Sequence, residues 1–418
     1  MPSLIPPSPE AFVLLDDARP VVGAHARLYR NLVGVVEAIE PKDIPAALER
    51  LKEGRAHGLH AAGYITYEAG LALEPKLAGM VPAIADGPLL WFGLFSSVDL
   101  LAAEDVPLLL PDPGGVSVGA VRPNIGRAAY DDAIDRTLSF IRAGDIYQAN
   151  ITFRAQVAVA GDPLAAYAAI RSRAAMGYGA VVRHGARHIL SFSPESFFTL
   201  DGDMLSARPM KGTARRHADP DADDRAAAAL VSDPKQRAEN LMIVDLLRND
   251  LSRVCRAGSV TVPRLFAVER YPTIHQMVSD VTGRLLPGHD AIDVLAALFP
   301  CGSVTGAPKI RAMEVIAAIE SASRGIYTGS IGSIDPDGNA RFNVAIRTLS
   351  LTAGRDEATL GLGSGIVADS RPADEWAECL DKSRFLGDSE VAERASGNQP
   401  AQDGRAIDSD GSVPTRLS

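Results

Sequence analysis

The sequence predicts an α+β protein built on large, mostly antiparallel β-sheets. Strand-like and helical segments alternate irregularly along the chain, without the steady strand–helix–strand rhythm of a doubly wound parallel sheet. The 418 residues are 46% hydrophobic and 22% charged, which is typical of globular proteins and excludes a mostly disordered chain. The apolar stretches are far shorter than the ~18 residues that a membrane-spanning helix needs.

Residues 1–110 form a first predicted unit. Within it, residues 12–15 and 62–67 are predicted to be short strands, and residues 44–51 have the apolar spacing of a helix. The stretch 107–115 contains three prolines and two glycines, which favours a linker to the next unit.

The character of the chain changes after residue 128. Residues 130–143 predict an amphipathic helix that ends at Gly144, and strands are expected around residues 147–153 and 188–192. The charged stretch 213–236 predicts an exposed excursion, whereas residues 240–247 are apolar almost all round and predict a buried helix.

Three later segments alternate between apolar and polar residues and are bounded by Gly, Asp or Asn, as strands usually are. They cover residues 327–334, 341–351 and 358–368. The last segment, residues 389–418, is rich in Asp, Ser, Gly, Gln and Pro, and is predicted to be a disordered tail.

The charge balance limits the possible partners. Forty-two basic and 52 acidic residues give a net charge of −10, so neither nucleic acid nor an anionic membrane is an expected partner. An anionic substrate would need a local cluster of cations or a metal ion. Cys255, Cys301 and Cys379 form no CxxC pair, and the N-terminus lacks the pattern of a secretory signal, so a cytoplasmic location is expected.

Two single residues could carry chemistry. Lys211, in the pentapeptide Pro-Met-Lys-Gly-Thr, could act as a nucleophile if its surroundings keep the amine neutral. Glu195 could act as a general acid if a partly apolar site holds its carboxyl protonated. Taken alone, each residue also has an ordinary explanation, as a surface lysine beside a turn and a loop glutamate.

Acidic residues on two predicted helices could hold a metal ion. Glu239 begins the helix predicted over residues 240–247, while Glu375, Glu378 and Lys382 lie at i, i+3 and i+7 on a second helix. Magnesium is commonly held by one or two carboxylates together with water and substrate oxygens, and Glu239 with Glu378 would suit it. The alternative is a solvated helix face with a Glu378–Lys382 ion pair.

The glycines of the segment 361–365, Gly-Leu-Gly-Ser-Gly, precede a strand-like run rather than a helix, so they lack the context of a dinucleotide-binding loop. Closely spaced glycines let backbone N–H groups approach an anion, although tight strand packing explains them equally well.

The order of these motifs is more specific than any one of them. The series SPE, PMKGT, AENLMIVDLLRNDL, GSVTGAPKIRAMEVI, Tyr327 with SIG, Arg347, GSGIVADS and the Glu375/Glu378/Lys382 helix closely resembles the chorismate-utilising enzymes. That family includes component I of anthranilate synthase, component I of aminodeoxychorismate synthase, and the isochorismate synthases. The resemblance covers residues 120–388 as the catalytic domain, and residues 1–110 also look like the N-terminal part of aminodeoxychorismate synthase component I.

The resemblance implies two large sheets that face each other with helices outside, residues 1–110 being integrated in the same sandwich, and a Mg²⁺ site between the sheets. It matches Glu239 and Glu378 to metal ligands, with Glu375 as an acidic neighbour. The positions that it matches to chorismate binding are Gly212, Thr213, Tyr327, Arg347, Gly363, Ser364, Gly365 and Lys382.

Lys211 points to the aminodeoxychorismate branch, because anthranilate synthases usually have alanine at this place. The implied reaction is amination of chorismate at C4 through a Lys211 adduct, with Glu195 as general acid, for p-aminobenzoate and folate synthesis. The chain has no glutaminase motif, so a separate glutamine amidotransferase subunit is expected to supply ammonia. Anthranilate formation, isochorismate formation and a non-catalytic chorismate-binding subunit remain the alternatives.

Two positions depart from the family pattern. Gln276 stands where relatives often have histidine, and the neighbouring His275 should point to the opposite face of a strand. Gln236 stands one helical turn before Glu239, where relatives often have an acid, so the surroundings of the metal site are expected to be less negative.

Overall fold

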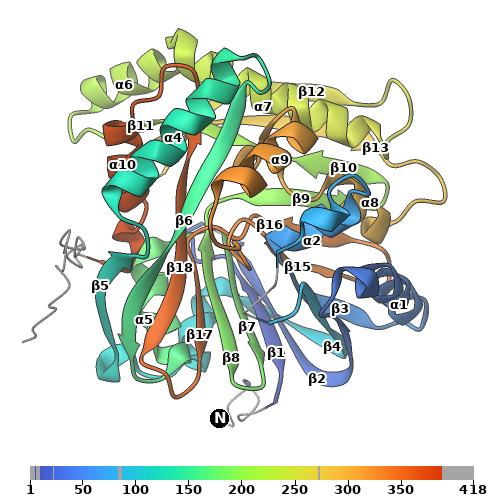
Figure 1. Cartoon of the computed structure of the whole chain (residues 1–418). Coiled ribbons are helices and arrows are strands. Elements are labelled where there is room, and N and C mark those ends of the chain that lie inside the picture. The colour runs from blue at the N-terminus through green and yellow to red at the C-terminus, as the bar shows by residue number, and fades with distance from the viewer. Residues whose placement is uncertain (1–4, 6–9, 22, 83–86, 272–273, 388–418) are drawn as a thin grey trace, which may run out of the picture.

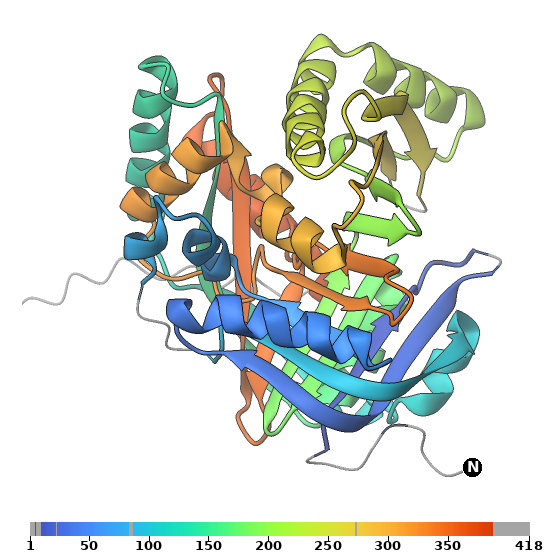
Figure 2. The same cartoon turned by 90° about the vertical axis from the view of Figure 1, so that its right-hand side faces the viewer.

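The computed structural model describes residues 5, 10–21, 23–82, 87–271 and 274–387 of the chain. Within them, 18 strands form one continuous hydrogen-bonded sheet, and every pairing between these strands is antiparallel. Helices pack around the strands (Figures 1 and 2). The predicted α+β class is therefore confirmed.

The strands follow one another in an order that mixes distant parts of the chain. One edge is formed by β12 (Thr261–Arg270), followed by β13 (Ile274–Arg284), which pairs with both β11 (Met210–Arg215) and β10 (Met204–Ala207). After β10 the order is β9 (Ser196–Asp201), β16 (Ala340–Asn343), β15 (Ser330–Ile334), β3 (His60–Ile65), β4 (Leu90–Ala102), β2 (His25–Ala38) and β1 (Phe12–Asp16). The sheet continues through β7 (Tyr178–His184), β8 (Arg187–Ser193), β17 (Thr348–Thr352), β18 (Glu357–Ile366) and β6 (Gln148–Ala160), and β6 also pairs with β5 (Ser117–Pro123) and β14 (Gly306–Ala307).

The two halves of this sheet face each other across a shared core. Side chains of β1, β7 and β8 pack there against side chains of β2, β3, β4 and β15. Two further cores lie on the outer faces. In β1, Val13 joins the inner core while Phe12 and Leu14 join an outer one, because successive side chains of a strand point to opposite faces. The predicted facing sheets are present as two halves of one sheet.

Helices cover both outer faces of the sheet. On one side lie α4 (Arg127–Arg142), α5 (Pro163–Ala174), α9 (Lys309–Ile319) and α10 (Pro372–Asp381). On the other lie α1 (Ile44–Ala56), α7 (Pro234–Ser252) and α8 (Ala291–Leu298). The short helix α2 (Tyr67–Leu73) follows β3, and α6 (Pro220–Ser232) precedes α7 and contacts β11 to β13.

Most of the predicted elements are confirmed, and the departures have physical reasons. The strand predicted over residues 62–67 ends at Ile65, since Tyr67 already begins α2. The segment 341–351 forms two strands, β16 and β17, because Arg347 between them has a φ of 51°, a conformation incompatible with an extended strand.

Two helical predictions need correction. The stretch 213–236 is not a simple exposed excursion, since it contains all of α6, whose Asp223 and Leu230 are buried. Helix α7 is amphipathic rather than apolar all round, because Leu241 on its outer side is 43% exposed.

The proline-rich stretch 107–115 contains the end of a short helix, α3 (Val106–Leu109), and a 3₁₀ turn over Pro113–Gly115. Strands β1 to β4, from the N-terminal part of the chain, pair with one another and with β7 and β15. The predicted tail, residues 389–418, lies outside the described residues. In the described part of the chain, no helix is long and apolar enough to cross a membrane.

Candidate active site

Lys211 lies where β11 approaches β18. The pairing of β11 with β13 shifts between Met210 and Thr213, and Gly212 in this irregularity has a φ of 94°, which glycine adopts without strain. A Cβ atom added at Gly365 would lie 3.3 Å from Lys211 Nζ. The amine of Lys211 therefore lies beside the backbone of β18, although the two residues are far apart in the sequence.

The strand β18 presents a surface without side chains towards this amine. Its apolar residues Leu360, Leu362 and Ile366 join an outer core, so the alternating Gly361, Gly363 and Gly365 lie on the inner face. At the half-buried Gly365, no β18 side chain stands between an anionic ligand and the backbone.

Ser364 points away from the inner face. Its hydroxyl lies 3.0 Å from the hydroxyl of Tyr130 on α4, and its side chain is buried. Only its backbone can take part in the site beside Lys211. Thr213 is exposed on β11, where it pairs with Gln276.

Glu195 lies in the bend between β8 and β9 and is 7% exposed. Its Oε1 accepts a hydrogen bond of 2.7 Å from the hydroxyl of Ser303. Burial raises the pKa of the Glu195 carboxyl, and the Ser303 hydrogen bond and the charges of Lys211 and Lys382 offset part of this rise. A carboxyl that stays protonated closer to neutral pH can act as a general acid.

Ser303 was missed by the sequence reasoning. It lies in a 3₁₀ turn over Gly302–Val304, within a motif that the resemblance already contains, but a serine hydroxyl in such a motif has no pattern of its own. The thiol of Cys301 lies 3.3 Å from the Ser303 hydroxyl, and burial raises the pKa of this thiol to about 12, so it remains protonated.

Gln148 was also missed, and the structure singles it out. Its side chain is fully buried, and neither Oε1 nor Nε2 has a hydrogen-bond partner among the described residues. A Cβ atom at Gly365 would lie 2.8 Å from Gln148 Nε2, so the amide lies beside the same glycine as Lys211. Because a buried amide without partners is costly, the Gln148 amide is suited to bind a ligand or an ordered water molecule here.

The predicted carboxylates lie on two helices, α7 and α10. Glu378 Oε1 pairs with Lys382 Nζ at 2.8 Å, and Lys382 Nζ also donates to the Gly363 carbonyl at 2.7 Å. At the edge of the group, Lys235 Nζ pairs with Asp369 Oδ2 at 2.7 Å. Lys382 thus links α10 to β18 and places positive charge next to the glycine-lined surface.

The two candidate ligands influence each other. Burial raises the pKa of Glu239, Lys211 and Lys235 oppose this rise, and the charge of Glu378 adds to it. Burial acts in the same direction on Glu378, but Lys382, Lys211 and Lys235 outweigh it and lower the pKa of that carboxyl. The charge of Glu375 acts on Lys235, so all three acids belong to one electrostatic group.

Glu239 and Glu378 remain candidate ligands for Mg²⁺. Among the described residues, no group of three or more His, Cys, Asp or Glu side chains is arranged to hold a metal ion. Magnesium, however, is usually bound through one or two carboxylates, with water and substrate oxygens completing the octahedron. Glu239 and Glu378 have the right chemistry for this mode of binding.

Tyr327 lies just before β15, and Arg347 lies between β16 and β17. The Arg347 guanidinium is largely buried, which lowers its pKa, and in the described structure it has no carboxylate partner; its Nη1 lies 3.4 Å from Met176 Sδ. It can therefore bind an anion. The Tyr327 ring covers Gly361, where an added Cβ would lie 2.0 Å from the ring carbon Cγ.

The departure from the family pattern at His275 and Gln276 is explained by their positions on β13. His275 is fully buried, with Nε2 2.9 Å from Asp223 Oδ1 on α6, while Gln276 Nε2 donates to the Gly212 carbonyl at 2.9 Å. The expectation that they point to opposite faces is confirmed. Gln236 also reaches Gly212, since its Oε1 would lie 3.0 Å from an added Cβ there.

A family model for chorismate binding enzymes matches residues 25–388, and the chain belongs to this family. It is 40% identical over 297 residues to anthranilate synthase component 1 1 of Haloarcula marismortui, covering 71% of this chain and 60% of that protein. It is 42% identical over 259 residues to aminodeoxychorismate synthase component 1 of Escherichia coli K12, covering 62% of this chain and 57% of that protein. The matches thus span about three fifths of these relatives.

Among solved structures, anthranilate synthase component I of Streptococcus pneumoniae TIGR4 matches with a TM-score of 0.73 and 25% identity, over 92% of this chain and 93% of that one. An isochorismate synthase from Bacillus anthracis matches at 21% identity with a TM-score of 0.70, over 90% of this chain and 95% of that one, which supports the fold.

Proposed function

We propose that this protein aminates chorismate at C4 to give 4-amino-4-deoxychorismate, as component I of an aminodeoxychorismate synthase. The observation that carries the proposal is the position of Lys211, whose amine lies beside Gly365 and within the electrostatic reach of Glu195. A nucleophile and a general acid thus face one region of the inner surface. The similarity to the E. coli aminodeoxychorismate synthase component agrees with this assignment.

The chemistry follows from these two groups. Lys211 first loses its proton to solvent, because only a neutral amine is a nucleophile. The Glu195 carboxyl then protonates the C4 hydroxyl, which leaves as water, while the Lys211 amine forms a bond to C2 and the ring double bond shifts. Ammonia then adds at C4, the double bond shifts back, and the bond between C2 and the Lys211 nitrogen breaks to release a neutral amine. A proton of the new ammonium group restores the Glu195 carboxyl.

Binding falls to the cations and backbone groups around the site. Chorismate is a dianion, so Arg347, Lys382 and the backbone N–H groups of β18 would offset its charge in a protein of net charge −10. Gly212 and Thr213 would contribute from β11, and Tyr327 from above Gly361. Mg²⁺ held by Glu239 and Glu378, with Glu375 nearby, would bind and neutralise the ring carboxylate.

The ammonia would come from a glutamine amidotransferase subunit. The relatives are described as component 1 of their synthases, which agrees with a second component here. Free ammonium should replace this partner in vitro.

The test is product identification. The purified chain is incubated with chorismate, Mg²⁺ and ammonium, and the product is analysed by mass and retention, with and without an aminodeoxychorismate lyase. A product that the lyase converts to p-aminobenzoate supports the proposal, and Lys211→Ala should then abolish or redirect its formation.

Anthranilate formation is the second candidate, because the H. marismortui anthranilate synthase component is as similar as the aminodeoxychorismate synthases. Anthranilate as the product would overturn the proposal and show that Lys211 does not direct the amine to C4. Turnover without ammonium would instead indicate isochorismate formation, with water as the nucleophile. A chain that binds chorismate without converting it would be a binding subunit.

A further inference from the structure

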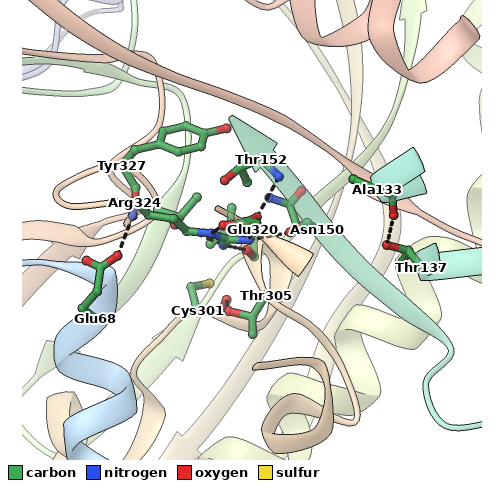
Figure 3. Close-up of polar contacts among 12 residues, drawn as sticks. Glu68, Ala133, Thr137, Asn150, Thr152, Cys301, Thr305, Glu320, Arg324 and Tyr327 are labelled. Atoms are coloured by element: carbon green, nitrogen blue, oxygen red, sulfur yellow. Dashed lines mark hydrogen bonds and ion pairs between the residues drawn. The ribbon is translucent and has the colours of Figure 1, made fainter. Parts of the chain in front are cut away.

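One buried arginine connects the segments that carry the candidate catalytic groups. Arg324 follows α9, and its side chain is 1% exposed. We call Arg324 with Glu320 and Glu68 the Arg324 cluster; Figure 3 shows it with the segments that it contacts. Tyr67 also lies against the guanidinium, 4.2 Å from Cζ to the ring centroid.

All five N–H groups of this guanidinium have partners. Nε and Nη2 donate to the two carboxylate oxygens of Glu320 at 2.8 and 2.7 Å. The second Nη2 hydrogen goes to the Asn150 carbonyl at 2.5 Å, and Nη1 donates to the Val304 carbonyl at 3.0 Å and the Thr328 hydroxyl at 3.3 Å. Since a guanidinium has five donors, none remains for a substrate.

Acidic side chains complete the cluster. Glu320 Oε1 also accepts the Thr152 backbone N–H at 2.8 Å. Glu68, which is 2% exposed on α2, accepts the backbone N–H groups of Arg324 at 2.5 Å and Gly325 at 3.0 Å. Burial alone would lower the pKa of Arg324, but the charge of Glu320 keeps it above its usual value. The guanidinium therefore stays charged.

Each of the segments held by Arg324 carries a residue of the candidate site. Val304 directly follows Ser303, which donates to Glu195. Asn150 lies two residues after Gln148 on β6, and Thr328 follows Tyr327. One side chain therefore fixes the relative positions of three segments that are distant in the sequence.

We propose that Arg324 is a positioning residue for the chorismate reaction. By holding the Val304 carbonyl, it fixes the position of the Glu195 carboxyl. By holding the Asn150 carbonyl, it fixes the position of the Gln148 amide. The inference rests on the proposed function, because the role of Glu195 as general acid belongs to it. Lysine cannot replace Arg324, since a single ammonium with three hydrogens cannot bridge four acceptor groups that lie in different directions.

The test compares Arg324→Lys with Arg171→Lys. Arg171 is a matched control: its side chain is only 11% exposed, it donates to both oxygens of Asp16 at 2.6 and 3.0 Å, and it donates to the Ala103 carbonyl at 2.9 Å, away from the candidate site. The rate is measured as chorismate consumed, whatever the product. For Arg324→Lys, we expect kcat to fall about 100-fold with KM changed much less, as a displacement of about 1 Å would cause. Arg171→Lys should retain its kcat.

A double-mutant cycle separates positioning from general destabilisation. If Arg324 acts through Ser303, the kcat losses of Arg324→Lys and Ser303→Ala should be clearly less than additive. Arg171→Lys should be additive with Ser303→Ala. Full additivity for Arg324, or equal kcat losses in the two arginine variants, would overturn the inference.

Hydrogen–deuterium exchange gives a readout that does not need activity. In Arg324→Lys, exchange should rise in peptides covering residues 148–152 and 301–305, but not in those covering residues 12–16; Arg171→Lys should show the reverse. If Arg324→Lys does not fold, Glu68→Gln serves as the milder variant, because its amide keeps one acceptor. Unchanged exchange in the first two segments contradicts the inference, whereas a different product contradicts only the proposed function.

Discussion

At Glu195, burial and polar neighbours act on the pKa in opposite directions. Burial raises the pKa, while the Ser303 hydroxyl and the charges of Lys211 and Lys382 lower it. The thiol of Cys301 contacts the same Ser303 hydroxyl. The balance decides how much of the carboxyl is protonated at a given pH, and hence how well it serves as a general acid.

The pH dependence of turnover should report this balance. The rate should fall as pH rises through the pKa of Glu195, since only the protonated form can donate. In Ser303→Ala, the loss of a hydrogen bond to the carboxylate raises this pKa further, so the fall should move to higher pH. Glu195→Gln should lower kcat by about 10²–10⁴-fold and abolish this limb. These three kcat–pH profiles provide the measurement; an unmoved limb in Ser303→Ala would contradict the assignment.

Gln148 should show opposite effects on activity and stability. Because its buried amide has no partner in the part of the chain that the structure describes, Gln148→Met should raise the free energy of unfolding by about 1 kcal/mol, while chorismate turnover falls. Urea denaturation and initial rates measure the two effects. The control is Gln156→Met, on the same strand but only half-buried, which should leave the rate unchanged. If Gln148→Met instead destabilises the protein, the amide of Gln148 is not unsatisfied.

At the scale of single elements, β18 serves two purposes on its two faces. Leu360, Leu362 and Ile366 pack into an outer core, whereas the glycines on the inner face leave room for other groups. At Gly365 these groups are the ends of Lys211 and Gln148, and at Gly361 the group is the Tyr327 ring.

Alanine at the two glycines should therefore have different effects. Gly365→Ala places a methyl group near flexible side-chain ends, so activity should fall steeply with little change in stability. Gly361→Ala forces the buried Tyr327 ring to move, and overpacking of this kind costs about 1–3 kcal/mol. Thermal unfolding together with initial rates distinguishes the two; equal destabilisation of both variants would be the contrary result.

Helices α7 and α10 should act together on a divalent cation. If Glu239 and Glu378 are its ligands, Mg²⁺ should raise the melting temperature of the protein by binding to the folded state, and a chelator should stop turnover. Glu239→Gln and Glu378→Gln should each abolish the Mg²⁺-dependent rise. Asp245→Asn, an exposed position on α7 paired with Arg248, is the control and should retain it.

At the scale of the whole molecule, the N-terminal strands lie in the middle of the sheet rather than beside it. Strand β3 pairs with β15, and β1 pairs with β7. The inner core likewise combines side chains from both parts of the chain, such as Tyr64 and Trp91 with Ala180 and Ile189. Removing the N-terminal part would split the sheet and expose this core.

A fragment of residues 120–388 should therefore not fold alone, even though the motif series lies within it. We expect it to lack near-ultraviolet circular dichroism and a cooperative unfolding transition, and co-expression with residues 1–119 should restore both. An independently folded and active fragment would show that the N-terminal strands are dispensable.

Sequence reasoning was most successful for elements with strong local patterns. The helices α1 and α4 and the strands β1, β8 and β18 all appear where apolar spacing predicts them. It was less successful where tertiary contacts decide. The burial of Asp223 on α6 depends on His275 and Arg216, and the break before β17 depends on the backbone of Arg347.

The sequence alone determined the class of fold, the family and the residue types of the site, because apolar periodicity and an ordered series of motifs are encoded locally. Only the tertiary structure decided that Ser303 contacts Glu195, that the Gln148 amide lies beside Lys211, that Ser364 points away, and that Arg324 joins their segments. These relations depend on which strands pair and which face each side chain takes, and both are set by packing between residues that are distant in the chain.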